Sequence, residues 1–238
     1  MTPDLLTLGV DTSGQAGSIG LVRGEIVVEE RSLAATGRRH ARTLVAEIQT
    51  LLRTHGASPR DVGLVAVSIG PGSFTGLRVG VVFGKTFCYT TGAPLVAVDT
   101  FAALAANAPA DLARVWVVED AQRGALFAAP YRRQGPVEFV PESPIEILEE
   151  AEVLRRAGTD DVFLGPGTKR LPPERCLPAE LSTPRGSAVA LLGAIEFARG
   201  RTVDPFALVP TYIRRSAAEE TAERKAALAA KGNASSPG

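Results

Sequence analysis

Short apolar runs alternate with amphipathic stretches along the first hundred residues. The shortest runs are almost continuously apolar, a pattern typical of strands that are buried on both faces of a sheet. The longer stretches repeat apolar residues at helical spacing. The expected elements are strands at 5–10, 18–22, 26–28, 64–67 and 95–98, and helices at 40–53, 74–90 and 100–106.

The same pattern begins again near residue 114. A strand expected at 114–119 ends in Asp120, and another strand follows it, just as the first strand of the chain ends in Asp11 and is followed by a hairpin. We interpret this similarity as a weak internal repeat, which predicts two related lobes with the second one reduced. The predicted parts are an N-terminal α/β lobe at 1–108, a smaller C-terminal α/β lobe at 109–215 with helices at 145–157 and 187–199, and a flexible tail at 216–238.

Composition narrows the class of protein. Lysine plus arginine and aspartate plus glutamate each number 26, so no overall field attracts nucleic acid. The two cysteines, Cys88 and Cys176, lie far apart in unrelated patterns, which favours a reduced cytoplasmic setting. The sequence shows no signal-peptide pattern and no apolar run of membrane-spanning length.

A glycine-rich loop joins the strand at 64–67 to the helix that follows it. A Gly-Pro-Gly turn and a candidate N-cap residue precede the helix N-terminus, and this layout can bind an anion. The loop matches neither the Walker A motif nor the dinucleotide-binding motif, because the chain lacks a glycine that each motif requires. A strand-to-helix turn without a ligand is the alternative. The candidate anion-binding residues are Gly70, Gly72 and Ser73.

Glycine recurs every fourth residue along the helix after this loop. Each glycine inside a helix costs about 1 kcal/mol relative to alanine, so three on one face are expected only where something packs very close. That neighbour is a helix of a partner or, as the alternative, the sheet of the same chain. With the amphipathic helix at 40–53, this face is the predicted partner interface, formed by His40, Leu44, Ile48, Gly76, Leu77, Gly80, Val81 and Gly84.

Polar residues follow the first strand of each predicted lobe. Asp11, Thr12 and Ser13 end the first strand, and Asp120 ends its counterpart. Facing acids across a cleft can hold a magnesium nucleotide, so these four residues are the candidate nucleotide site. The alternative is that each aspartate caps its own turn.

Metal and hydrolase chemistry find little support in the sequence. His40 and His55 are the only histidines, and no convergent set of His, Cys and carboxylate ligands can be assembled around them. The Gly-x-Ser-x-Gly motif of serine hydrolases is absent. No catalytic residue and no metal ligand is therefore predicted.

Several runs of residues resemble the TsaB (YeaZ) family. The most specific is Gly-Pro-Gly-Ser-Phe-Thr-Gly-Leu-Arg at 70–78, supported by Val-Asp-Thr-Ser at 10–13, Asp-Ala-Gln-Arg-Gly at 120–124 and Pro-Thr-Tyr-Ile-Arg at 210–214. Together they span nearly the whole chain. The resemblance implies a two-lobed α/β fold of the actin, hsp70 and sugar-kinase type (ribonuclease H-like), in agreement with the internal repeat.

The resemblance also implies a role in making N6-threonylcarbamoyladenosine in tRNA. In that system the related subunit TsaD transfers the threonylcarbamoyl group, TsaB is its dimerisation and scaffold partner, and the ATPase TsaE binds the pair. The implied partners are TsaD, TsaE, a second copy of the chain when it is alone, and tRNA through the complex, with no membrane. No cofactor is expected for this subunit, since the complex uses the ATP and magnesium.

TsaD carries a metal-binding His-x-x-x-His motif on the corresponding helix. Here that motif reads His40-Ala-Arg-Thr-Leu44, without its second ligand, so the resemblance implies no independent catalysis. The run Glu119-Asp120-Ala-Gln also departs from the Ile-Asp-Ala-Arg of many relatives. Three hypotheses follow: a non-catalytic partner of TsaD, an ATP-binding enzyme of the phosphotransferase type that uses Asp11 and Asp120, and, last, a glycoprotease-like peptidase.

Overall fold

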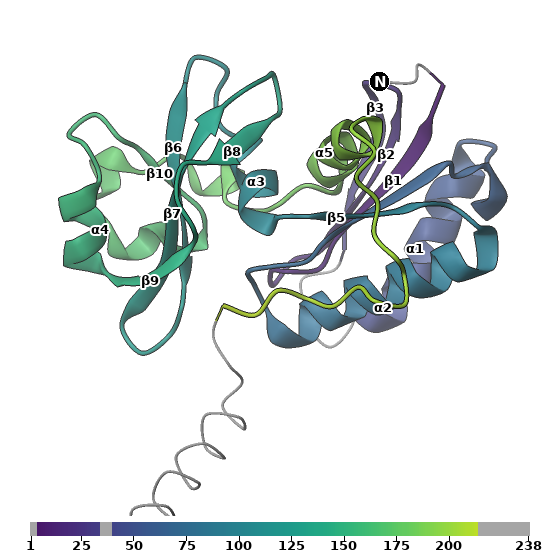
Figure 1. The fold of residues 1–238 in the computed structure, drawn as a ribbon, viewed down its shortest axis with the longest axis horizontal. Helices are drawn as coiled ribbons and strands as arrows, with labels where there is room; N and C mark the ends of the chain where they lie inside the picture. The colour runs from purple at the N-terminus through teal and green to yellow at the C-terminus, as the bar shows by residue number, and fades with distance from the viewer. Residues whose placement is uncertain (1–3, 34–39, 214–238) are drawn as a thin grey trace, which may run out of the picture.

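The computed structural model of the protein describes residues 4–33 and 40–213, so the tail expected at 216–238 lies outside it. Two β-sheets with helices packed around them form two lobes (Figure 1). No helix of the described residues is both long and apolar enough to cross a membrane. The strands of the first sheet are β1 (Leu6–Asp11), β2 (Ser18–Arg23), β3 (Ile26–Ser32), β4 (Leu64–Ser68) and β5 (Leu95–Val98).

The first sheet has the strand order β3-β2-β1-β4-β5. β1, β2 and β3 pair antiparallel, whereas β4 and β5 run parallel to β1. Val67 packs with residues of α1 (His40–Thr54) and α2 (Phe74–Thr91), and its neighbour Ala66 packs with α5 (Gly186–Ala198). Because successive strand residues point to opposite faces, α1 and α2 cover one face of the sheet and α5 covers the other.

The second sheet repeats the start of the first. Its β6–β7 hairpin is antiparallel, like β1–β2, and β10 lies parallel to β6 as β4 lies to β1. The described residues contain no counterpart of β5 in this sheet. The predicted α/β class, the internal repeat and the reduced second lobe are confirmed. The strands are β6 (Arg114–Asp120), β7 (Ala125–Arg133), β8 (Phe139–Pro141), β9 (Glu146–Glu149) and β10 (Phe163–Leu164), in the order β10-β6-β7-β8 with β9 also paired to β7.

The repeat extends to the loop after the parallel strand of each lobe. Gly70 after β4 and Gly165 after β10 both precede a proline, and their φ angles are 126° and 122°. Glycine tolerates this region, which side chains disfavour. The 18-residue α2 follows the first turn, but only a short 3-10 helix (Pro166–Arg170) follows the second. The second lobe thus keeps the turn and loses the long helix.

The helix expected at 145–157 is shorter than predicted. It begins at Glu150 as α4 (Glu150–Arg156), because the residues before it form β9, in which Leu148 pairs with Leu126 of β7. Cross-strand pairing of two buried leucines outweighs local helix propensity here. Three further 3-10 helices lie at Pro59–Asp61, Pro173–Arg175 and Ala179–Leu181.

The last helix of each predicted part reaches into the other lobe (Figure 1). Phe101 of α3 (Thr100–Ala105) lies in the core of the second sheet. Conversely, α5 lies in the range expected for the C-terminal lobe, yet it packs on the first sheet. The contact is so close that a Cβ added to Gly9 of β1 would lie 2.0 Å from the carbonyl oxygen of Gly186. The parts predicted at 1–108 and 109–215 are therefore interlocked, although the boundary itself stays a prediction.

Candidate functional site

The glycine row of α2 faces the sheet of its own chain. A Cβ on Gly76 would lie 2.0 Å from the carbonyl oxygen of Thr12, and one on Gly80 would lie 2.5 Å from the Thr12 hydroxyl oxygen. A Cβ on Gly84 would lie 2.9 Å from a methyl group of Val67. The absence of side chains lets α2 rest directly on β4 and on the end of β1. The expectation that this bare face meets a partner is therefore corrected.

The other residues of the predicted interface are also inside the molecule. Leu44 and Ile48 of α1 and Leu77 and Val81 of α2 are each at most 3% exposed, and all but Leu77 belong to the core between these helices and the first sheet. Buried side chains offer little surface to a partner, so these four residues mainly hold the helices in place, although Leu44 also lines a groove between α1 and α2. The side chain of His40 lies outside the described part of the structure.

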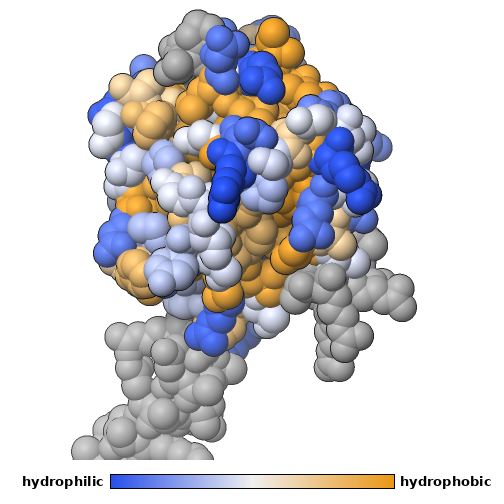
Figure 2. Space-filling model, turned by 90° about the vertical axis from the view of Figure 1, so that its right-hand side faces the viewer, coloured by the Kyte–Doolittle hydropathy of each residue, from blue (hydrophilic) through white to orange (hydrophobic). Residues whose placement is uncertain are grey.

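The opposite side of α2 carries exposed apolar residues. Phe74 and Val82 are 38% and 59% exposed, and Val45 of α1 is 50% exposed. They line a groove of about 660 Å³ between α1 and α2. Apolar surface is visible between polar groups on the side of the first sheet and its helices (Figure 2). The sequence pattern did not indicate that this face is exposed, because either side of α2 could have been the buried one.

Residues 203–213, called the C-terminal strap below, run along α2 (Figure 1). The ring of Tyr212 packs on Phe74 with 4.7 Å between centroids. The guanidinium of Arg78 lies 3.9 Å from the centroid of Phe74, and its Nε donates to the Tyr212 hydroxyl at 3.0 Å. Farther along, Lys85 Nζ donates to the carbonyl of Phe206 at 3.2 Å. The strap therefore fixes the outward side chains of α2 from one flank.

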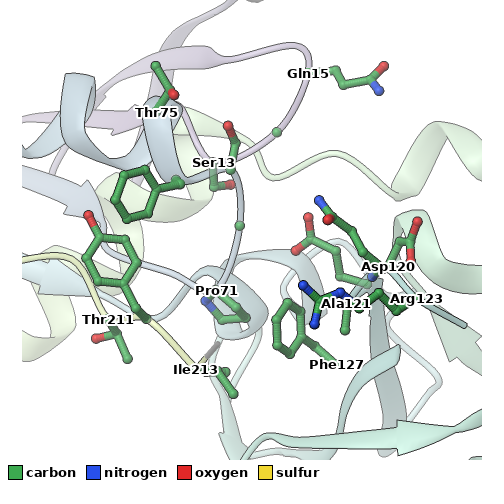
Figure 3. Close-up of a pocket in the computed structure, with 17 residues that line it drawn as sticks. Ser13, Gln15, Pro71, Thr75, Asp120, Ala121, Arg123, Phe127, Thr211 and Ile213 are labelled. Carbon is green, nitrogen blue, oxygen red and sulfur yellow. Dashed lines mark hydrogen bonds between the residues drawn. The ribbon is translucent and has the colours of Figure 1, made fainter. Parts of the chain in front are cut away.

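A cleft of about 590 Å³ lies between the lobes (Figure 3). Ser13 from the first lobe and Asp120 from the second both line it, so the structure brings these two predicted nucleotide-site residues together. Phe74 and Tyr212 line the same cleft, and Phe74 also lines the α1–α2 groove. Phe74 therefore borders both the cleft and the groove.

Asp11 and Thr12 are closed off from solvent. Asp11 Oδ1 accepts hydrogen bonds from the hydroxyls of Ser13 at 2.7 Å and Ser68 at 2.5 Å, and no group of the described residues bonds its Oδ2. Burial raises the pKa of Asp11 to about 6. Thr12 Oγ1 donates to the carbonyl of Gly76 at 2.7 Å. As they stand, these two residues do not fit a magnesium nucleotide held through their side chains.

Glu119, the residue before Asp120, lines the same cleft and has a strongly raised pKa. Burial raises the pKa of Glu119 to about 8, with smaller contributions from the charges of Asp11 and Asp120. Asp120 Oδ1 accepts from the backbone N–H of Gln122 at 2.8 Å, so it caps its own turn, as the alternative interpretation stated. Glu119 was missed, although a carboxylate directly after the apolar run at 115–118 was a signal for it.

Backbone N–H groups of the Gly-Pro-Gly loop already donate hydrogen bonds within the chain. The N–H of Gly70 donates to Thr100 Oγ1 at 3.0 Å, and the N–H of Ser73 donates to the Ser13 carbonyl at 2.7 Å. Gly72 lies so close to Ser13 that a Cβ would come within 2.7 Å of its carbonyl oxygen. An anion would have to displace these internal bonds. The expectation of an anion site at Gly70 and Ser73 is therefore corrected, and the loop joins α2 to the first lobe.

Known proteins resemble this chain along most of its length. The TsaB protein of Bacillus subtilis, a tRNA threonylcarbamoyladenosine biosynthesis protein, is 30% identical over 225 residues, covering 89% of this chain and 95% of the relative. The chain belongs to the TsaB family. TsaB of Escherichia coli is 27% identical with the same coverage of both chains. The YeaZ structure from Pseudomonas aeruginosa superposes with a TM-score of 0.77 at 25% identity and covers 88% of this chain and 100% of its own.

A second family is related to one part of this TsaB chain. The model of TsaD, tRNA N6-adenosine threonylcarbamoyltransferase, matches residues 32–143. That segment contains α1 and α2, the two helices that border the exposed groove. The transferase family therefore shares the part of the sequence that forms this helix pair.

Proposed function

We propose that this chain is the non-catalytic partner subunit of the complex that makes N6-threonylcarbamoyladenosine in tRNA, and that it binds and supports the TsaD-type transferase. Membership of the TsaB family supports the pathway, because its relatives are named as biosynthesis proteins for this nucleoside. The reaction takes place on tRNA, so we place the protein in the cytoplasm.

The exposed groove between α1 and α2 is the observation that carries the partner role. Val45, Phe74 and Val82 expose apolar surface there, and a contiguous apolar patch of this kind marks a protein contact on soluble proteins. The transferase family shares the corresponding segment. Two such helix pairs can therefore pack face to face around a pseudo-twofold axis.

The proposal assigns catalysis to the transferase. Leu44 stands where the resemblance places the second histidine of the TsaD motif, and its buried side chain offers no ligand atom. Among the described residues, no group of three or more His, Cys, Asp or Glu side chains is placed to hold a metal ion. The same groove would pair with a second copy when the transferase is absent, TsaE would bind the assembled pair, and tRNA would be reached through the complex.

Val82→Glu is expected to weaken association with the TsaD-type subunit of the same genome by about 100-fold or more. The change puts a carboxylate into the centre of an apolar contact, and a pair with Arg78, one turn earlier on the same helix, offsets only part of the cost of removing that charge from water. Isothermal titration calorimetry measures the affinity. Ile147→Glu, at an apolar residue of the second lobe that is 37% exposed, is the control and should leave binding unchanged. Equal affinity of Val82→Glu and the unaltered protein would rule out this groove as the contact.

Nucleotide binding in the interlobe cleft is the second candidate function, because Ser13 and Asp120 line one cleft. It would require the loop that holds Asp11 and Thr12 to open. We expect calorimetry of the isolated chain with millimolar Mg-ATP to show no binding, since both side chains are buried away from the cleft. A saturable heat that is lost in Asp120→Asn would favour the enzyme hypothesis instead.

A further inference from the structure

One charged side chain stands out in the α1–α2 groove. Among the described residues that line it, Arg78 is the only one with a formal charge, and the rest are apolar or carry hydroxyl groups. α2 contains no acidic residue, and the single acid of α1 is Glu47. Glu47 lies 3.7 Å from the guanidinium of Arg31 and is therefore already paired. The groove thus presents a cation without supplying an anion of its own.

The guanidinium of Arg78 is held in a fixed orientation. It lies over the ring of Phe74 at 3.9 Å, and Nε donates to Tyr212 Oη at 3.0 Å. Its terminal nitrogens form no ion pair with a carboxylate in the part of the chain that the structure describes. Stacking on an aromatic ring leaves the outer edge of a guanidinium available for a carboxylate. Arg78 is therefore a preoriented donor at the rim of an apolar surface.

The cation in the groove affects two possible occupants differently: a second copy of this chain, and a partner that carries an acidic residue. In a contact between two copies, each Arg78 would be covered by a face without an available acid, and a guanidinium that loses water without a carboxylate is strongly disfavoured. A partner with Asp or Glu opposite Arg78 would instead form a bidentate, charge-assisted pair surrounded by apolar contacts. The same residue can thus favour one partner and disfavour the other.

We propose that Arg78 selects the occupant of the groove: an apolar helix face of the transferase-type subunit that carries an Asp or Glu opposite it, in preference to a second copy of this chain. The inference rests on the proposed function and adds the chemistry of the partner surface. Tyr212 and Phe74 act as positioning residues for the guanidinium.

Arg78→Met tests the proposal, since methionine keeps an apolar stem and removes the charge. We expect its affinity for the TsaD-type subunit of the same genome to fall about tenfold or more by calorimetry, and its remaining affinity to lose the salt dependence of the unaltered protein. Self-association, measured by sedimentation velocity, should become about tenfold stronger, because the unpaired charge is gone. Arg78→Lys should keep self-association weak while losing part of the affinity for the transferase subunit, because it keeps the charge without the bidentate fork.

Lys85→Met is the matched control, because Lys85 is a cation on the same helix that donates to the strap and does not line the groove. Lys85→Met should change the affinity for the TsaD-type subunit and the strength of self-association by no more than about twofold each. Unchanged transferase affinity in Arg78→Met, with Val82→Glu still disruptive, would overturn the inference and leave the proposed function standing. If Val82→Glu also binds the TsaD-type subunit normally, the groove is not the contact, and both the inference about Arg78 and the proposed partner contact fail. Weaker self-association in Arg78→Met would also overturn the proposal.

Discussion

Gly76→Ala is expected to lower the free energy of unfolding by about 3 kcal/mol. The new Cβ would lie 2.0 Å from the carbonyl oxygen of Thr12, a backbone atom that cannot rotate away. Alanine gains about 1 kcal/mol over glycine in helix propensity, but the overlap outweighs that gain. Urea unfolding followed by circular dichroism measures the difference.

Thr75→Ala is the matched control for Gly76→Ala, since it changes the preceding, exposed residue of the same helix. It should alter the free energy of unfolding by less than about 0.5 kcal/mol. A Gly76→Ala variant as stable as the unaltered protein would show that α2 does not rest on β1 this closely. The partner role would then regain the glycine row as a candidate contact.

Glu119→Gln is expected to stabilise the protein at high pH. The folded state raises the pKa of Glu119 from 4.5 to about 8, so the folded protein binds its proton more tightly than the unfolded chain does. The stability of the unaltered protein should therefore fall as pH rises from about 4.5 to about 8 and then level off. Glutamine does not ionise, so the variant should be about 2 kcal/mol more stable than the unaltered protein at pH 9 and similarly stable at pH 5. The expected gain is smaller than the free energy that corresponds to the whole change in pKa, because the Glu119 carboxylate is partly in contact with solvent.

Denaturant unfolding at pH 5, 7 and 9 measures this effect. Glu149→Gln, at an exposed carboxylate of the same lobe, is the control and should leave the pH dependence unchanged. Asp11, whose pKa is raised to about 6, should keep its own loss of stability between about pH 4 and 6 in both proteins. Parallel stability curves of Glu119→Gln and the unaltered protein across this range would show that Glu119 ionises as freely as in the unfolded chain.

The Phe74–Tyr212 stack links the two hollow regions of the molecule. Phe74 lines both the groove and the cleft, and Tyr212 brings the C-terminal strap to the same point. A protein bound in the groove would therefore contact a ring that also borders Ser13 and Asp120. The strap joins the first sheet through the bridge between Val203 and Leu95, which anchors this stack to the core.

Local sequence patterns predicted the element order and the repeat well. Continuous apolar runs identified β1, β4 and β5, because strands buried on both faces need no polar side chains. The aspartate at the end of the first strand and its counterpart Asp120 revealed the duplication, which the two sheets confirm. β9 was missed, because its pairing with β7 depends on residues about twenty positions away.

The sequence by itself determined the fold class, the two related lobes and the TsaB family, because periodicity and a specific glycine-rich motif are local properties of the chain. It could not decide which side of α2 is buried, since a row of glycines suits a tight internal contact and a tight external one equally. Only the tertiary structure placed Gly76 against Thr12 and left Phe74 and Val82 facing out. It also placed Ser13 of the first lobe and Glu119 of the second on one cleft, because that arrangement depends on how the two lobes pack.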